Sequence, residues 1–246
     1  MQNRPANFLM KRKSLLYIFL ITIVIGSGIR SIPSFAEPLP DKITQQNPLK
    51  ENQILYNGKE WHNLYTSIKG DQFLFSKDYL QGSVTINGKL YKNIRINYDV
   101  FNDEIITPTN HGAIVKLNKE MVDSFTLDFG FRTYRFLNTQ EDSLTSIKGF
   151  VNVLYKGKAS LYVKYKKEIQ LLAVDDKYDL FYQTYRIYFL NDGVVHQITS
   201  KSDLLKILNK DKTQIKDFIK KNKLRISKKV PESFIPVIRY YDSISQ

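Results

Sequence analysis

The sequence predicts a mainly β protein of the α+β kind: an antiparallel meander that forms a curved open sheet or half-barrel, with short amphipathic helices packed on or beside it. The first of three observations is the stretch from residue 82 to residue 107, GSVTINGKLYKNIRINYDVFNDEIIT. Its central segment alternates apolar and polar residues, which is the period-2 pattern of a strand with one buried and one solvent-facing side. The apolar positions are Ile94, Ile96, Tyr98 and Val100, and the polar positions are Arg95, Asn97 and Asp99.

The second observation is a set of turn sequences between apolar runs. An Asn-Gly pair at 87–88 and an Asn-Asp pair at 102–103 divide the stretch into three segments, and Asn-Asp-Gly at 191–193 separates two later ones. Asn, Asp and Gly tolerate the positive φ angles that two-residue hairpins require. These turns therefore predict hairpins, which join antiparallel strands.

The third observation is composition and spacing. The chain holds 16 Tyr and 15 Phe in 246 residues, and aromatic residues favour strands. No gap between strand candidates before Thr199 is long enough for the helical crossover that parallel neighbours need. With 42% hydrophobic residues, the chain is able to bury a substantial core.

The N-terminal 36 residues predict a secretory signal peptide. A basic group at 11–13 precedes an apolar run from Leu15 to Ile25, and small residues at Ser34 and Ala36 indicate cleavage between Ala36 and Glu37. A membrane span needs roughly 20 apolar residues, so we expect no transmembrane span after cleavage. An uncleaved membrane anchor is the alternative.

After the leader, we expect a flexible lead-in at 37–54, which holds three prolines, then an antiparallel β domain at 55–199 and a helical segment at 200–246. The net charge is +13, from 37 basic and 24 acidic residues. Five basic residues and no acid lie in the leader, which leaves 32 against 24, or +8. A basic exported protein suits acidic sugars, lipopolysaccharide or anionic lipid headgroups, although a lysine-rich surface also serves solubility alone.

Three short helices are predicted in the C-terminal segment. Ser200 with Asp203 reads as a capping box, and Asp211 with Gln214 repeats the pattern before a second apolar stripe. Ser233 is the predicted cap of a last helix, with a proline at 236 in its first turn. Such short helices need a surface to bury their apolar faces, so we expect them to dock on the sheet or to form a small terminal bundle.

No stretch carries a recognisable set of reacting groups, so we assign no catalytic residues, no metal site and no cofactor. The three histidines are far apart in sequence and lack ligand spacing. The absence of Cys excludes disulfides, thiol catalysis and lipid attachment at a cysteine. Paired acids such as Asp103-Glu104 are typical of solvated turns. For Asp99 we expect a lysine or arginine partner on a neighbouring strand.

Two basic stretches are the candidate binding residues for an anionic ligand. In the first, Lys164 and Lys166 share one face of a predicted strand and Lys167 lies beside them. The second follows the second predicted helix, and its members are Lys220, Lys221, Lys223, Arg225, Lys228 and Lys229. Lysines on an edge strand also protect against aggregation without any ligand. Because the leader predicts export, we expect no nucleic-acid partner.

Three stretches together resemble a family of uncharacterised exported proteins of Bacteroidetes bacteria. They are the 82–107 meander, then YFLNDGVVHQITSKSDLLKIL, then DKTQIKDFIKKNKLRISKK leading into VIRYYDSI. The resemblance covers most of residues 55 to 244. It implies a cell-envelope location and no assigned activity, so no functional residues are transferred.

These observations favour an exported, non-enzymatic envelope protein, a periplasmic binding or interaction module for a protein, a glycan or a lipid. Secretion or surface attachment are the alternatives to the periplasm. One alternative function is a hydrolase of envelope polymers, which requires that Asp99, Glu104 or His111 converge in one cleft. Another is a half-barrel like the periplasmic lipoprotein carriers, with the helical tail inside a curved sheet.

Overall fold

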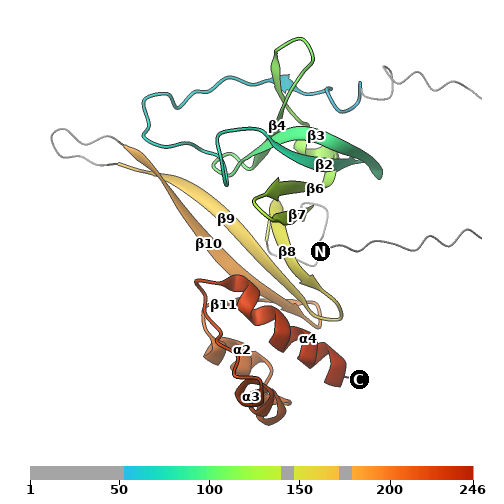
Figure 1. Ribbon diagram of the computed structural model, residues 1–246, viewed down its shortest axis with the longest axis vertical. Coiled ribbons are helices and arrows are strands. Elements are labelled where there is room, and N and C mark those ends of the chain that lie inside the picture. The colour runs from blue at the N-terminus through green and yellow to red at the C-terminus, as the bar shows by residue number, and fades with distance from the viewer. Residues whose placement is uncertain (1–52, 140–146, 172–178, 246) are drawn as a thin grey trace, which may run out of the picture. The chain divides into compact units, whose positions relative to one another are not determined.

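In the computed structural model, the described residues (53–139, 147–171 and 179–245) form a single antiparallel sheet of eleven strands with short helices after it (Figure 1). All of these residues belong to one compact unit, which spans residues 46–246. The predicted signal peptide, its cleavage site at Ala36 and Glu37, and residues 37–52 of the lead-in lie outside the described residues.

The strand order across the sheet is β1-β5-β4-β3-β2-β6-β7-β8-β9-β10-β11, and the sheet is open, with β1 and β11 at its edges. The strands are β1 (Lys59–Glu60), β2 (Leu80–Ile86), β3 (Lys89–Asp99), β4 (Glu104–Pro108), β5 (Ile114–Lys116), β6 (Val122–Phe129), β7 (Arg132–Asn138), β8 (Phe150–Lys156), β9 (Ser160–Gln170), β10 (Leu180–Asn191) and β11 (Val194–Ile198). The helices are the 3-10 helices η1 (Lys119–Met121) and η2 (Pro231–Phe234) and the α-helices α2 (Lys201–Ile207), α3 (Lys212–Lys221) and α4 (Ile235–Ile244).

The predicted fold class is confirmed: the sheet is antiparallel and open, and three short α-helices follow it. The predicted turns are confirmed as well. Asn87, Asp103 and Asp192 have φ angles of +48°, +58° and +49°, in the left-handed region that Asn and Asp tolerate better than other side chains. Turn chemistry thus fixes where each hairpin reverses.

One expectation about β3 is wrong. The strand has no solvent-facing side at its C-terminal end, because Asn97 and Asp99 are 1% and 0% exposed. The segment from Gln72 to Asp78 covers that side. Asn97 Nδ2 donates to the Ser76 and Asp78 carbonyls at 2.9 and 3.1 Å, so the buried amide is satisfied by backbone of the covering segment.

The prediction that Asp99 pairs with a lysine or arginine on a neighbouring strand is also wrong. Its carboxylate accepts from the backbone N–H and side-chain Nδ2 of Asn102, at 2.9 and 2.8 Å. The residue opposite it on β4 is Glu104. Burial, the largest influence, and the Glu104 charge raise the pKa of Asp99. Asp99 therefore holds its own turn in place instead of pairing with a neighbouring strand.

Two main apolar clusters lie along the sheet. The first surrounds Tyr98, where Phe125 and Phe136 stack with ring centroids 4.5 Å apart and Phe150 meets Phe125 edge to face at 5.0 Å. Such aromatic pairs contribute roughly 0.5–1.5 kcal/mol each beyond the burial of their area. This cluster joins the strands on both sides of β7.

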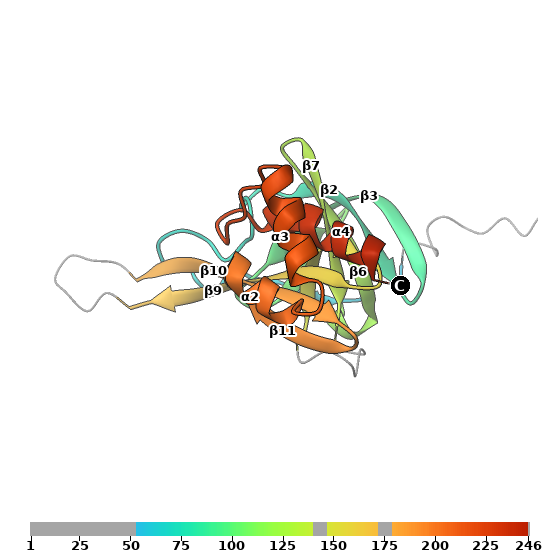
Figure 2. The same ribbon diagram turned by 90° about the horizontal axis from the view of Figure 1, so that it is seen from below.

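The second cluster packs the helices against β9 and β10, and Figures 1 and 2 show α2, α3 and α4 beside the β11 end of the sheet. Leu161 and Phe189 from the strands pack in it with Ile215 and Phe234 from the tail. Asp242 of α4 accepts from the Ala159 N–H and the Tyr155 hydroxyl, each at 3.0 Å. The helical tail therefore docks on the sheet, as predicted.

The helix caps match the predictions in part. The Ser200 side chain accepts from the Asp203 N–H, and α2 begins there as predicted. Asp211 precedes α3 but makes no side-chain cap hydrogen bond. Ser233 lies in η2 and donates to the Val230 carbonyl, so it does not cap α4. A 3-10 turn, which the sequence pattern does not reveal, takes the place of that cap.

Replacement of Asn97 with Ala tests the burial of this side of β3. The change leaves the Ser76 and Asp78 carbonyls without their donor, which we expect to lower the free energy of unfolding by about 1–3 kcal/mol. Urea unfolding followed by circular dichroism measures it. Asn110→Ala, at an exposed position, is the matched control and should stay within about 0.5 kcal/mol of the parent. Equal effects of the two changes would contradict the assignment.

Candidate functional site

The carboxylate of Asp103, in the β3–β4 turn, accepts hydrogen bonds from three other side chains. Asp103 Oδ1 accepts from the Tyr98 hydroxyl of β3 at 2.5 Å and from Lys164 Nζ of β9 at 3.0 Å. Asp103 Oδ2 accepts from Lys119 Nζ of η1 at 2.5 Å. Lys164 Nζ also donates to the Phe150 carbonyl of β8 at 2.9 Å. We call Asp103, Tyr98, Lys119 and Lys164 the Asp103 cluster.

The pKa shifts of the cluster follow from burial and charge. Burial alone would raise the pKa of Asp103, but Lys164, Lys119 and the Tyr98 hydroxyl outweigh it, so the pKa lies below its ordinary value. Burial lowers the pKa of Lys164 in spite of the Asp103 charge, so the ion pair does not fully offset the lost hydration of the lysine. Burial, then the Asp103 charge, raises the pKa of Tyr98 well above its ordinary value.

The backbone of Gly149 lies directly against the Asp103 cluster. Its φ is +83°, and a Cβ atom there would lie 1.8 Å from Asp103 Oδ2 and 3.0 Å from Lys164 Nζ. A side chain at this position would therefore clash with the carboxylate and would also be strained by the backbone conformation. The close approach fixes the residue before it, Lys148, beside the β3–β4 turn.

Next to the Asp103 cluster lies a pocket of about 580 Å³, within the range of roughly 300–1,000 Å³ that is usual for small-molecule sites. We call it the basic pocket. Its walls come from the β3–β4 turn, the residues before β8, and the facing side chains of β9 and β10. The lining residues are Val100, Phe101, Asp103, Lys148, Lys164, Tyr165, Lys166, Glu168, Thr184, Tyr185, Arg186 and Tyr188.

The pocket has an excess of positive charge: four basic residues against two acidic ones, a difference of +2. Asp103 is already neutralised within its cluster, and Glu168 pairs with Lys166 at 2.5 Å. Within the described ranges, Lys148 and Arg186 form no ion pair. These two side chains are thus the cations of the pocket that remain available to an anion from outside.

Aromatic residues flank these charges on both faces of the β9–β10 hairpin. Phe101 lies edge to face with Phe181 at 5.5 Å. Tyr165 and Tyr185, which are paired in the register, meet at 6.1 Å on the opposite face from Lys164 and Arg186. Burial raises the pKa of Tyr165 to about 12, so that phenol stays protonated at any physiological pH. On the face of Lys164 and Arg186, the pocket combines the Tyr188 ring and the Thr184 hydroxyl with the cations, and the β3–β4 turn adds Phe101.

The structure places the residues of the first predicted basic stretch on two different sides of β9. Lys164 and Lys166 line the basic pocket, as their shared face requires. Lys167 points to the other side of β9, where its Nζ donates to the Asp71 carbonyl at 2.7 Å and to its Oδ1 at 3.1 Å. That lysine is a structural tie to the segment before β2.

The second predicted stretch does not form one site. Lys228 and Lys229 line a smaller pocket of about 200 Å³ that shares Tyr185 and Arg186 with the basic pocket. Lys220 and Lys223 line a separate groove between α2 and α3, together with Lys201 and Lys216. Lys221 and Arg225 are exposed and line none of these pockets.

Sequence reasoning missed Lys148 and Arg186. Arg186 lies opposite Lys164 in the β9–β10 register, and directly opposed residues share a face of the sheet. This register can be predicted only when the length of the β9–β10 hairpin is known, and the residues between the two strands do not indicate that length. Lys148 carries no sequence signal, because its position depends on contacts of Gly149 with a turn 46 residues earlier in the chain.

The acids and histidines singled out for a hydrolase do not converge in a cleft. Asp99 binds its own turn, and Glu104 pairs with Lys116 at 2.7 Å. His111 is exposed and lines none of the pockets. Within the described ranges, no group of three or more His, Cys, Asp or Glu side chains is placed to hold a metal ion.

Two further findings concern the chain as a whole. In the part of the chain that the structure describes, no helix has the length and apolar character needed to cross a membrane. Comparison of the chain with protein-family models, with curated proteins and with solved structures gives no match.

Replacement of Asp103 with Asn tests the cluster. At pH 7 the change leaves Lys119 and Lys164 partly buried without their carboxylate, which we expect to lower the free energy of unfolding by about 3 kcal/mol. Since the folded-state pKa is depressed, the contribution is complete above the unfolded value of about 3.9 and is lost as the pH falls through the folded value. The difference from the parent chain should therefore shrink below about pH 4.

Urea unfolding at pH 7 and pH 3 measures both effects. Glu104→Gln, which breaks the more exposed pair with Lys116, is the control and should change stability by about 1 kcal/mol or less. An Asp103→Asn effect that is small at pH 7, or that does not depend on pH, would contradict the assignment.

Proposed function

We propose that this protein is an exported, non-enzymatic module of the cell envelope that binds an acidic glycan in the basic pocket. The predicted signal peptide supports export, and the family resemblance implies a cell-envelope location, for which we propose the periplasm. The observation that carries the proposal is the pair of cations, Lys148 and Arg186, that face a pocket whose acidic residues are already paired.

The class of ligand follows from the pocket walls. Carboxylates or sulfates of an acidic sugar would pair with Lys148 and Arg186, and Arg favours bidentate contacts with such groups. The faces of sugar rings would lie against Phe101 and Tyr188, and hydroxyl groups would bond Thr184. Aromatic surfaces with a few convergent polar groups are usual for small-ligand sites.

The neighbouring pocket favours a polymer over a single sugar. Lys228 and Lys229, in the segment between α3 and η2, add two cations to a pocket that Arg186 also lines. Three separate cationic positions, at Lys148, Arg186 and Lys228–Lys229, match a chain that carries a charge on successive sugar units. Multiple weak contacts along one chain raise affinity without any single strong contact.

Calorimetric titration of the chain with a hexamer of galacturonic acid, and with the neutral hexamer maltohexaose, tests the proposal. We expect binding of the acidic hexamer only, weaker at high salt because exposed charges are screened. Joint replacement of Lys148 and Arg186 with Gln should weaken binding at least about tenfold, since two hydrogen-bonding cations are lost.

The matched control is the joint replacement of Lys201 and Lys220 with Gln, which removes the same charge from the groove between α2 and α3. The control should leave binding unchanged. Equal weakening by both double variants would indicate nonspecific attraction, and equal binding of the neutral hexamer would also contradict the proposal.

A further inference from the structure

The β7–β8 ladder is unusually short for strands of seven residues each. It consists of three pairs, which are Phe136–Asn152, Leu137–Val151 and Asn138–Phe150. Beyond them the two strands diverge and share no further backbone pair. The register of β8 against β9 shifts between Val153 and Tyr155, and a bulge of this kind bends a strand. The result is a V-shaped gap in the middle of the sheet, which we call the β7–β8 gap.

Both walls of the gap are free strand edges. From Arg132 to Arg135, β7 pairs with β6 on one side and has no partner strand on the other among the described residues. From Val153 to Lys156, the described part of the chain offers β8 no partner except β9. A free edge presents backbone N–H and C=O groups at strand spacing, which is a template for another extended chain.

The gap also contains a buried amide that lacks a well-formed hydrogen bond. Asn152 is 2% exposed, and its Nδ2 makes no hydrogen bond with any described residue. The amide lies beside the Tyr165 hydroxyl and acts on it as a donor, which lowers the pKa of a phenol that burial raises more strongly. The contact nevertheless lacks the geometry of a proper hydrogen bond. Nearly all buried polar groups in proteins are paired, and this poorly paired amide is able to donate to an acceptor that enters the gap.

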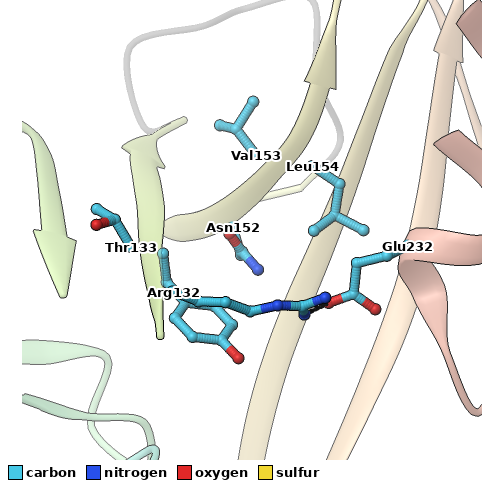
Figure 3. Close-up of a pocket in the computed structure, with 7 residues that line it drawn as sticks. Arg132, Thr133, Asn152, Val153, Leu154 and Glu232 are labelled. Carbon is cyan, nitrogen blue, oxygen red and sulfur yellow. Dashed lines mark hydrogen bonds and ion pairs between the residues drawn. The ribbon is translucent and has the colours of Figure 1, made fainter. Parts of the chain in front are cut away.

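An ion pair closes the mouth of the gap. Figure 3 shows the Arg132 side chain reaching from β7 to Glu232, with the Asn152 amide beside it. Arg132 Nη1 lies 2.7 Å from Glu232 Oε1 of η2. The Arg132 side chain is 59% exposed, and exposed pairs are worth only about 0–1 kcal/mol. The closure is therefore weak and easily opened.

We propose that the β7–β8 gap accepts an extended peptide segment of a partner protein, which adds as a strand to the free edges and whose backbone carbonyl accepts from Asn152 Nδ2. A peptide fits better than a small molecule, because the cavity of about 240 Å³ is below the usual range for small-molecule sites. Its walls offer main-chain groups in the pattern that strand addition uses. Tyr165, whose hydroxyl lies near Asn152, is the one residue used here that also lines the basic pocket. The inference does not depend on the proposed function.

A displayed library of random ten-residue peptides, selected on the whole chain, supplies the probe. Counter-selection uses the Asn152→Leu variant, which removes the buried donor and keeps the volume. Because an unpaired buried amide is destabilising, this variant should melt at the same temperature as the parent or higher. Selected peptides, labelled with fluorescein, should bind the parent at least about tenfold more tightly than Asn152→Leu.

Two further measurements locate the site on the parent fold. Glu232→Gln removes the ion pair at the mouth and should tighten peptide binding about two- to fivefold. Hydrogen exchange should show protection by the peptide at the amides of residues 133–135 or 153–155. These measurements remain decisive if Asn152→Leu fails to fold.

Failure to enrich any peptide over the counter-selected variant would overturn the proposal. Peptides that bind Asn152→Leu as tightly as the parent, or that protect amides elsewhere, would overturn it as well. In either case Asn152 and the Arg132–Glu232 pair would serve only to shield a free edge.

Discussion

Asp103 lies in a tight turn, at a φ of +58°, and its carboxylate accepts from Tyr98, Lys119 and Lys164. These partners come from β3, η1 and β9, so one anion joins segments up to 61 residues apart in the chain. In a partly buried setting each charge must be compensated, or the group loses more hydration energy than it regains. The position of the β3–β4 turn against β9 therefore depends on this cluster.

The basic pocket follows from that constraint. The cluster holds the β3–β4 turn as one wall and, through the close approach of Gly149, places Lys148 at its rim. It also neutralises Asp103, an acid that would otherwise compete for the cations of the pocket. The β9–β10 hairpin supplies the facing wall, and its other end carries the helical tail. One hairpin thus supports both the pocket and the tail.

Local sequence signals were sufficient for the fold class, the hairpin turns and the Ser200 cap, because each depends on residues close together in the chain. Contacts between segments that are far apart in the sequence cannot be predicted from such local signals. The segment that covers Asn97 and Asp99 has no periodic pattern of its own, so the alternation in β3 by itself predicts a solvent-facing side there. The same holds for the basic pocket: Lys164 and Lys166 were found from their spacing, but Arg186 depends on the β9–β10 register and Lys148 on a contact with Asp103.

A double-mutant cycle between Asp103 and Lys164 tests the central claim most directly, because it isolates their interaction from the other effects of each change. The variants are Asp103→Asn, Lys164→Met and the pair together, each unfolded with urea at pH 7. If the two side chains hold the turn against β9, their coupling should amount to about 1–3 kcal/mol, as for residues in direct contact. Effects that add to within about 0.5 kcal/mol would contradict this account of the fold.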